Sequence, residues 1–114
     1  MVILEPTEEQ VNKLFHALAD ATRRDIVRRC AVGESSLTHL AKTYPMSFTA
    51  VQKHVAVLER AGLVIKERRG REQLVHTDAE AVSRAKHVLA EIEATWRGRI
   101  ERMADVLAEE RETR

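Results

Sequence analysis

The chain has 114 residues, of which 44% are hydrophobic, 32% are charged and only 4% are aromatic. This length and composition suit one soluble globular domain over residues 1–114, and the scarcity of aromatic residues argues against stacking on single-stranded bases. The net charge is +1, but residues 20–71 contain eleven Lys and Arg against five Asp and Glu, a local net charge of +6. A positive central segment favours a polyanionic partner such as DNA.

The single cysteine, Cys30, excludes an internal disulfide and favours a reducing, cytoplasmic compartment. Its helical register with Ile26 predicts a buried, unreactive thiol rather than a redox sensor. The opening MVILEP is too short and too soon acidic to predict a secretory signal. No apolar run approaches the roughly 20 residues that span a bilayer, so the sequence predicts no membrane association.

Two amphipathic helices are predicted at the N-terminus. Thr7 and Gln10 form a T-x-x-Q capping box that begins the first helix. Its apolar stripe consists of Val11, Leu14, Phe15 and Leu18. Asp20 is expected to cap the second helix, which ends near Gly33. The outer face of that helix presents Arg23, Arg24, Arg28 and Arg29. The first two arginines could contact phosphates, and the last two are expected to stay solvated.

A helix-turn-helix pattern follows over about residues 35–61. The third helix is expected to begin at Ser35 or Ser36 and to close at Tyr44, because a residue before proline disfavours the helical conformation. Ser47 then caps a fourth helix, and Gly62 occupies the position of a left-handed residue that ends one. The apolar face of the fourth helix consists of Val51, Val55 and Leu58.

Two strands joined by a basic turn are predicted over about residues 63–76. Residues 63–65 are apolar and largely branched, as in a strand. The segment from Glu67 to Glu72 is expected to be a charged turn around Gly70, after which residues 73–76 return as the second strand. The sequence therefore predicts a mainly α fold with a small β-hairpin. This is a winged helix-turn-helix with the order α-α-α-α-β-β-α.

A final helix is predicted from a cap at Asp78 to about residue 110. Gly98 within it is explained either by a close approach of another helix or by a kink. Its apolar positions recur every three or four residues, close to a heptad seam. They are Val82, Ala85, Leu89, Ile92, Trp96, Ile100, Met103 and Leu107. A seam of this kind favours dimerisation through the helix. The polar tail of residues 109–114 is expected to fray.

The fourth helix presents a candidate DNA-recognition face opposite its core. This face consists of Phe48, Thr49, Gln52, Lys53 and Ala56. Gln52 can donate to and accept from an adenine edge, Lys53 suits a guanine edge or a phosphate, and Phe48 or Thr49 suits a thymine methyl. The first-turn amides beside Ser47 favour a phosphate. The alternative is a solvated helix face, which the outward Phe48 disfavours.

The hairpin tip adds a basic cluster made of Lys66, Arg68, Arg69 and Arg71. Arginines on a flexible turn can reach phosphates or a narrow minor groove. The alternative is a charged edge that protects a strand from pairing with other chains. The position of the cluster after the fourth helix favours DNA contact.

These motifs together resemble the ArsR-type family of bacterial winged-helix repressors. The matching segments are ALADATRRDIV, MSFTAVQKHVAVLERAGLV and IKERRGREQLVH. The long charged last helix with Trp96 is similar to the metal-independent branch of that family. The resemblance implies a homodimer that binds a partly palindromic operator in double-stranded DNA and represses transcription. It also implies a bacterial cytoplasmic protein that is nucleoid-associated when bound to DNA.

The resemblance also implies roles for particular residues. The positions facing DNA would be Ser47, Thr49, Gln52, Lys53 and His54, with Arg68, Arg69 and Arg71 at the wing tip. The first and last helices would form the subunit interface, with Val11, Leu14, Phe15, Leu89, Ile92, Trp96, Ile100 and Met103. Periodicity places His54 beside the core, so a buried hydrogen-bonding role competes with phosphate contact.

Metal and cofactor sites are not predicted. The sensors of the family hold paired cysteines in the third helix, where this chain has Ser36 and Thr38, and hydroxyls are poor ligands for soft metals. On the last helix only His87 and Glu91 could begin a second site, and two ligands do not complete a zinc site. The sequence does not indicate whether a small-molecule effector binds.

Two classes of function stay open at this point. The first is a dimeric transcriptional repressor, and the second is a protein-interaction module that uses the last helix of a winged-helix scaffold. The fold alone does not separate them, but DNA binding weakens steeply with salt. An enzyme is not predicted, because the sequence has no glycine-rich phosphate loop and no nucleophile–base pair at a known spacing.

Overall fold

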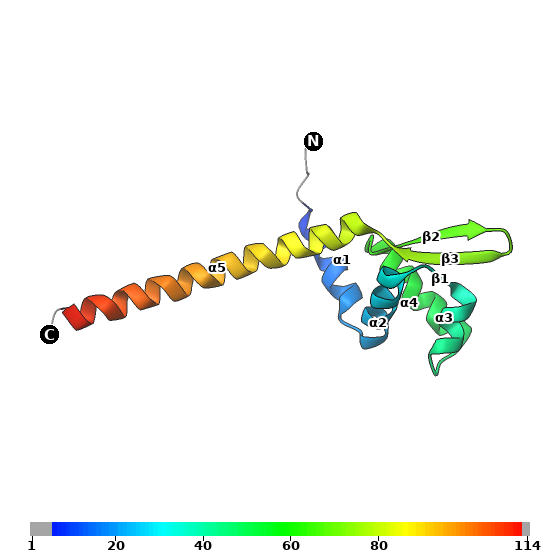
Figure 1. Ribbon diagram of the computed structural model, residues 1–114, viewed down its shortest axis with the longest axis horizontal. Helices are drawn as coiled ribbons and strands as arrows, with labels where there is room; N and C mark the ends of the chain where they lie inside the picture. The colour runs from blue at the N-terminus through cyan, green and yellow to red at the C-terminus, as the bar shows by residue number, and fades with distance from the viewer. Residues whose placement is uncertain (1–5, 113–114) are drawn as a thin grey trace. The chain divides into compact units, whose positions relative to one another are not determined.

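The computed structural model describes residues 6–112, so residues 1–5 of the MVILEP stretch and residues 113–114 of the polar tail lie outside the described part. The chain divides into two compact units, Met1–Arg84 and Ala85–Arg114. The first unit contains helices α1 to α4, a three-stranded sheet and the start of helix α5, and the second contains the remainder of α5 (Figure 1). The assignment of one domain to residues 1–114 stays a prediction.

Helices α1 (Glu8–Leu18) and α2 (Ala21–Val32) begin at the predicted caps. The Thr7 hydroxyl accepts from the backbone N–H of Gln10 at 3.1 Å, and the side-chain oxygen of Gln10 accepts from the backbone N–H of Thr7 at 2.8 Å. The Asp20 carboxylate caps α2 by accepting from the backbone N–H of Arg23 at 3.0 Å. Each cap satisfies a donor that a helix otherwise leaves unpaired in its first turn.

Helices α3 (Leu37–Thr43) and α4 (Phe48–Arg60) form the predicted helix-turn-helix. Ser36 caps α3, because its hydroxyl accepts the N–H three residues later at 3.0 Å. Ser47 caps α4 with the same geometry at 3.1 Å. Gly62 follows α4 with φ +77°, a left-handed conformation that glycine adopts without strain. These local signals were therefore sufficient to predict both helices.

The sheet contains one strand more than the predicted hairpin. Strands β1 (Ser35–Ser36), β2 (Val64–Arg69) and β3 (Glu72–Thr77) are antiparallel in the order β1-β3-β2. Ser35 pairs with Val75, whereas the sequence predicted that the third helix could begin at this serine. A strand of two residues has no periodicity to detect, which explains the difference.

The wing turn is shorter than predicted. The sequence predicted a turn from Glu67 to Glu72, but these residues extend the two strands, and only Gly70 and Arg71 lie between them. Gly70 has φ +65° and supplies the left-handed conformation of a tight turn. The boundary was wrong because charged residues on both faces of an exposed ribbon show no alternation of apolar and polar positions.

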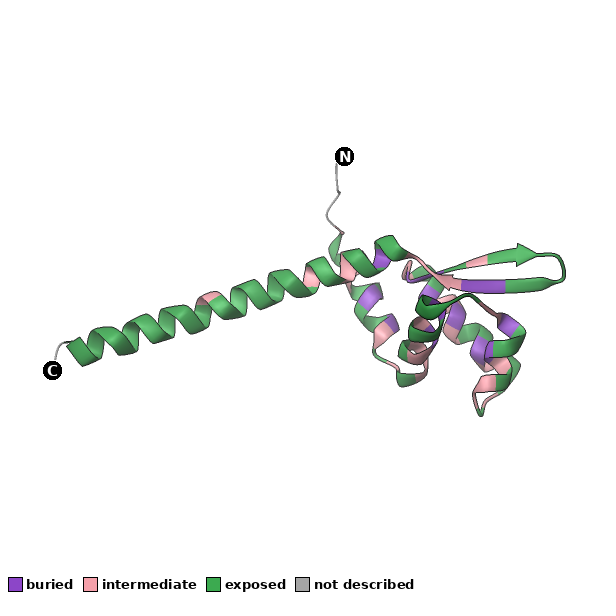
Figure 2. Ribbon diagram, viewed as in Figure 1, coloured by how far each residue is buried: buried purple, intermediate pink, exposed green. Residues whose placement is uncertain are grey.

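The core draws apolar side chains from every helix of the first unit and from strands β2 and β3, and the buried positions lie along these elements in Figure 2. Its buried members are Leu14, Ala17, Ile26, Cys30, Leu37, Leu40, Val51, Val55, Leu58, Leu63, Val64, Leu74, Val75 and Ala81. Leu14, which the sequence analysis placed in a subunit interface, is buried within its own chain and lies away from the exposed surface. Burial raises the pKa of the Cys30 thiol to about 11, which agrees with a buried, unreactive cysteine.

Helix α5 (Ala79–Glu112) is continuous and includes Gly98. In the second unit its apolar stripe is exposed. The exposed members there are Leu89, Ile92, Trp96, Ile100, Met103, Val106 and Leu107. No helix within residues 6–112 combines the length and apolar character needed to cross a membrane.

Candidate nucleic-acid interface

Helix α4 has one fully buried face and one exposed face. Val51, Val55 and Leu58 are completely shielded from solvent. The predicted recognition residues Phe48, Thr49, Gln52 and Lys53 are all exposed. Ala56, at the far end of that face, is half-buried. Burial of the apolar side of α4 therefore presents amide, ammonium, hydroxyl and aromatic groups together on one surface.

The wing divides its basic residues between two faces. Paired residues on neighbouring strands lie on the same face, and the partner of Lys66 is the buried Val75. The Lys66 ammonium lies 3.4 Å from a carboxylate oxygen of Glu59 on α4. Alternation along β2 puts Arg68 on the face of Lys66 and puts Arg69 on the other face. Of the two arginines on β2, Arg68 therefore shares the side of the sheet from which Lys66 reaches α4, and Arg69 does not.

Arg69 is already engaged by two carboxylates. Its Nη1 donates to Oε1 of Glu34 at 2.8 Å, and its Nη2 donates to Oε2 of Glu67 at 3.1 Å. These two acids raise the pKa of Arg69, with Glu34 as the larger cause. By contrast, no hydrogen bond or ion pair links the side chain of Arg68 or Arg71 to any other residue within 6–112. The three wing arginines, which sequence reasoning treated alike, are thus not equivalent.

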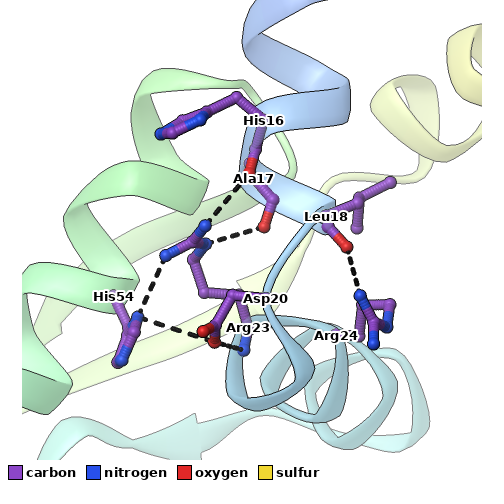
Figure 3. A network of polar contacts seen from close by, with 7 residues as sticks. All are labelled: His16, Ala17, Leu18, Asp20, Arg23, Arg24 and His54. Atoms are coloured by element: carbon purple, nitrogen blue, oxygen red, sulfur yellow. Dashed lines mark hydrogen bonds and ion pairs between the residues drawn. The ribbon is translucent and has the colours of Figure 1, made fainter.

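His54 faces inward from α4 and is half-buried. Nη1 of Arg23 donates to its Nδ1 at 3.3 Å, and the Asp20 carboxylate lies 3.9 Å from the same nitrogen (Figure 3). This contact supports the hydrogen-bonding role that periodicity suggested for His54. Phosphate contact by His54 stays a prediction. Arg23 was expected as a candidate phosphate contact. Its guanidinium instead donates hydrogen bonds to groups of the protein itself.

A second polar cluster fastens the helix-turn-helix to α2. The Tyr44 hydroxyl donates to Oδ2 of Asp25 at 2.6 Å, and Nε of Arg29 donates to the same oxygen at 2.8 Å. The Arg29 guanidinium also lies 5.8 Å from the centre of the Tyr44 ring. Burial, and then the contact with Asp25, raise the pKa of Tyr44 to about 12. Arg29 is exposed, as expected, and its guanidinium also binds the Asp25 carboxylate.

Three of the positions considered as metal ligands make contacts within the protein. The Ser36 hydroxyl caps α3, and Nε2 of His87 lies 3.1 Å from a carboxylate oxygen of Glu91. Across the described range, 6–112, no three His, Cys, Asp or Glu residues come together in a group that could hold a metal ion.

Comparison with known proteins gives several similarities, although no protein-family model matches the chain. It is 38% identical over 72 residues to the HTH-type transcriptional regulator Rv2034 of Mycobacterium tuberculosis, covering 63% of this chain and 67% of that protein. A solved ArsR family transcriptional regulator is 31% identical with a TM-score of 0.75, covering 82% of this chain and 97% of that one. An ArsR-like regulator from Rhodococcus sp. RHA1 is 28% identical with a TM-score of 0.77, covering 86% and 90%.

The Tyr44–Asp25 contact predicts a pH-dependent effect of Tyr44→Phe. The Tyr44 hydroxyl, followed by Arg29, lowers the pKa of Asp25 below its usual 3.8. The carboxylate therefore stabilises the folded state above that value, and this stability is lost as the pH falls through the lowered pKa. Urea denaturation should show a smaller free energy of unfolding for Tyr44→Phe at neutral pH and a shrinking difference below about pH 4. A difference that is independent of pH would contradict this assignment.

Proposed function

Because the chain belongs to the ArsR family of winged helix-turn-helix transcriptional regulators, we propose that it is a homodimeric repressor of a partly palindromic operator. The observation that carries the proposal is the arrangement of α4. Its apolar face is buried, and its opposite face exposes Gln52 and Lys53 to solvent. As a member of this family the chain is a DNA-binding regulator and not an enzyme. The direction of regulation and the operator symmetry belong to the proposal.

In the proposed complex, α4 enters the major groove with its N-terminal half. Gln52 pairs with an adenine edge through its amide, and Lys53 contacts a guanine edge or a phosphate. The methyl of Thr49 and the ring of Phe48 suit a thymine methyl. Ser47, at the cap, lies where a phosphate approaches the first turn of the helix. Four of these five residues are exposed without a side-chain partner within residues 6–112, the exception being the capping Ser47.

The wing contributes charge rather than base specificity. Arg68 and Arg71 are exposed and have no acidic partner among the described residues, so both are available to phosphates or to a narrow minor groove. Arg69 contributes less, because a phosphate must replace Glu34 and Glu67 before it can bind. The basic segment of residues 20–71, with its net charge of +6, provides long-range attraction to DNA.

Self-association is proposed through the exposed apolar stripe of α5 and through Val11 and Phe15 of α1. Trp96 and Met103 are each 58% exposed. A contiguous stripe of exposed large apolar residues is typical of a surface that binds another protein chain. The spacing of the stripe is close to the heptad seam of paired helices. A twofold dimer would place two copies of α4 about 34 Å apart, one helical turn of DNA. This arrangement explains why a palindromic operator is proposed.

We further propose that the protein acts in the cytoplasm without a bound metal. The third helix offers the hydroxyls of Ser36 and Thr38 where metal sensors of the family carry thiolates, and the Ser36 hydroxyl is already used as a cap. Soft metals favour thiolate over hydroxyl ligands. The supporting observation is therefore the chemistry of these two side chains.

Replacing Gln52 with Ala should relax sequence preference. Loss of a paired amide–adenine contact costs about 1–3 kcal/mol of discrimination at one base pair. The measurement compares dissociation constants of wild type and Gln52→Ala for an operator selected from random DNA and for its single-base variants. The variant should lose discrimination at one position in each half-site and keep it elsewhere. Unchanged discrimination at every position would remove Gln52 from the recognition face.

The two wing arginines provide a matched pair. Arg68→Ala should weaken binding to all sequences and lower the salt slope of the affinity by about one unit, because one phosphate contact is lost. Arg69→Ala should have a smaller effect on both, since its charge is already paired with Glu34 and Glu67. Both values come from titrations at several salt concentrations. A larger effect of Arg69→Ala than of Arg68→Ala would reverse the proposed roles.

The dimer is tested by placing a charge in the apolar stripe of α5. Ile100→Asp should convert the dimer to a monomer, because an unpaired carboxylate is costly to bury. Ala94→Asp is the matched control, since Ala94 is exposed on the opposite side of the same helix. Light scattering coupled to size exclusion gives the mass of each variant. A dimeric Ile100→Asp, or a monomeric Ala94→Asp, would place the interface elsewhere.

A further inference from the structure

Three elements meet at the side chain of Arg23 (Figure 3). Nε donates to the carbonyl oxygen of Ala17 at 2.7 Å, and Nη2 donates to that of His16 at 3.0 Å. Both carbonyls belong to the last turn of α1. Nη1 donates to Nδ1 of His54 on α4 at 3.3 Å. One guanidinium at the start of α2 thus connects the end of α1 to the candidate recognition helix.

The chemistry of each partner suits this junction. The last carbonyls of a helix carry a partial negative charge. That of His16 also accepts from the backbone N–H of Ala19 at 3.2 Å, so the guanidinium is its second donor. A guanidinium offers five donors in one rigid plane, so it can serve both carbonyls and a third acceptor together. Arg23 is itself held in place, because its backbone N–H donates to the Asp20 carboxylate at 3.0 Å. That N–H is the largest cause of the lowered pKa of Asp20.

His54 connects the fixed side chain of Arg23 to the recognition face of α4. It directly follows Lys53 on α4, but its ring points inward to Arg23 while Lys53 is exposed. Since a guanidinium can only donate, Nδ1 of His54 accepts in this contact, and the ring lies with Nδ1 toward Arg23. Burial of Val51 and Val55 is non-directional, whereas this hydrogen bond has a preferred direction. The bond therefore limits rotation of α4 about its own axis.

We infer that Arg23 is a positioning residue for DNA recognition. Through His54 it sets the orientation of α4 relative to the end of α1, so that Gln52 and Lys53 reach the bases together. This role does not require Arg23 to contact DNA. The inference rests on the proposed function, because it assigns a cause to the sequence preference of α4.

Arg24 offers a matched control. Its Nη1 donates to the carbonyl oxygen of Leu18 at 2.7 Å, so it also binds the end of α1. Within the described part of the chain, however, its side chain makes no hydrogen bond or ion pair with α4. Arg23→Gln and Arg24→Gln each remove one cation from the same turn of α2. Only the first removes the connection to His54.

The experiment measures affinity for a duplex that the wild-type protein selects from random DNA, and for a scrambled duplex. Arg23→Gln should weaken binding to the selected duplex about tenfold, a size typical of coupling within one hydrogen-bond network. Binding to the scrambled duplex and the salt slope should be unchanged. Arg24→Gln should not reduce the preference for the selected over the scrambled duplex, because any phosphate contact by Arg24 would weaken binding to both alike. His54→Ala should match Arg23→Gln, and the double variant should lose no more than either single one.

Several results would overturn the positioning role. Equal losses in Arg23→Gln and Arg24→Gln would show that binding the end of α1 is sufficient. A salt slope lowered by about one unit in Arg23→Gln would instead indicate a direct phosphate contact. Additive losses in the double variant would show that Arg23 and His54 act separately.

Circular dichroism and thermal melting establish that each variant is folded at the temperature of the titration. If Arg23→Gln does not fold, Arg23→Lys keeps the charge without the planar set of donors. It should show the same loss of discrimination, and retained discrimination in both Arg23→Lys and His54→Ala would overturn the inference. A wild-type protein that selects no duplex contradicts the proposed function and this inference with it. A selective wild type with an equally selective Arg23→Gln overturns the positioning role alone.

Discussion

Burial of the apolar face of α4 is the constraint on which the rest of the structure depends. Val51, Val55 and Leu58 are fully shielded from solvent, and with 3.6 residues per turn their burial forces Gln52 and Lys53 to the surface. The same burial positions the turn before α4 and the strand after it, because both are attached to its ends. A recognition surface therefore follows from the packing of a core, before any contact with DNA is considered.

Polar contacts orient the elements relative to one another, which non-directional apolar packing does not do. Arg23 reaches His54, Tyr44 reaches Asp25, and Arg69 reaches Glu34. Each of these contacts joins residues that are distant in sequence, and each uses a donor or acceptor with a preferred geometry. The first two orient the helix-turn-helix relative to α1 and α2. The third ties the wing to the loop before β1 and neutralises one of its charges.

Sequence reasoning succeeded where the signal is local. The serine and threonine caps, the glycine after α4 and the apolar face of α4 are each defined within a few residues, and the structure confirms them. It missed β1, whose two residues become a strand only because β3 lies beside them. It also missed the pairing of Arg69 with Glu34, since 35 residues separate them and the sheet brings them together. Helix caps and the spacing of apolar residues can thus be predicted from the sequence. Ion pairs between distant segments can be identified only once the fold is known.

The most direct test of the central claim is the affinity of the wild-type protein for DNA selected from a random pool, measured by fluorescence anisotropy with excess scrambled competitor at several salt concentrations. The account predicts tight, competitor-resistant binding whose logarithm falls linearly with the logarithm of salt, by about 0.9 for each phosphate contacted. Binding with no preference over the competitor, at low and moderate salt alike, would contradict it. That result would favour a protein-interaction module that uses the exposed stripe of α5 on a winged-helix scaffold.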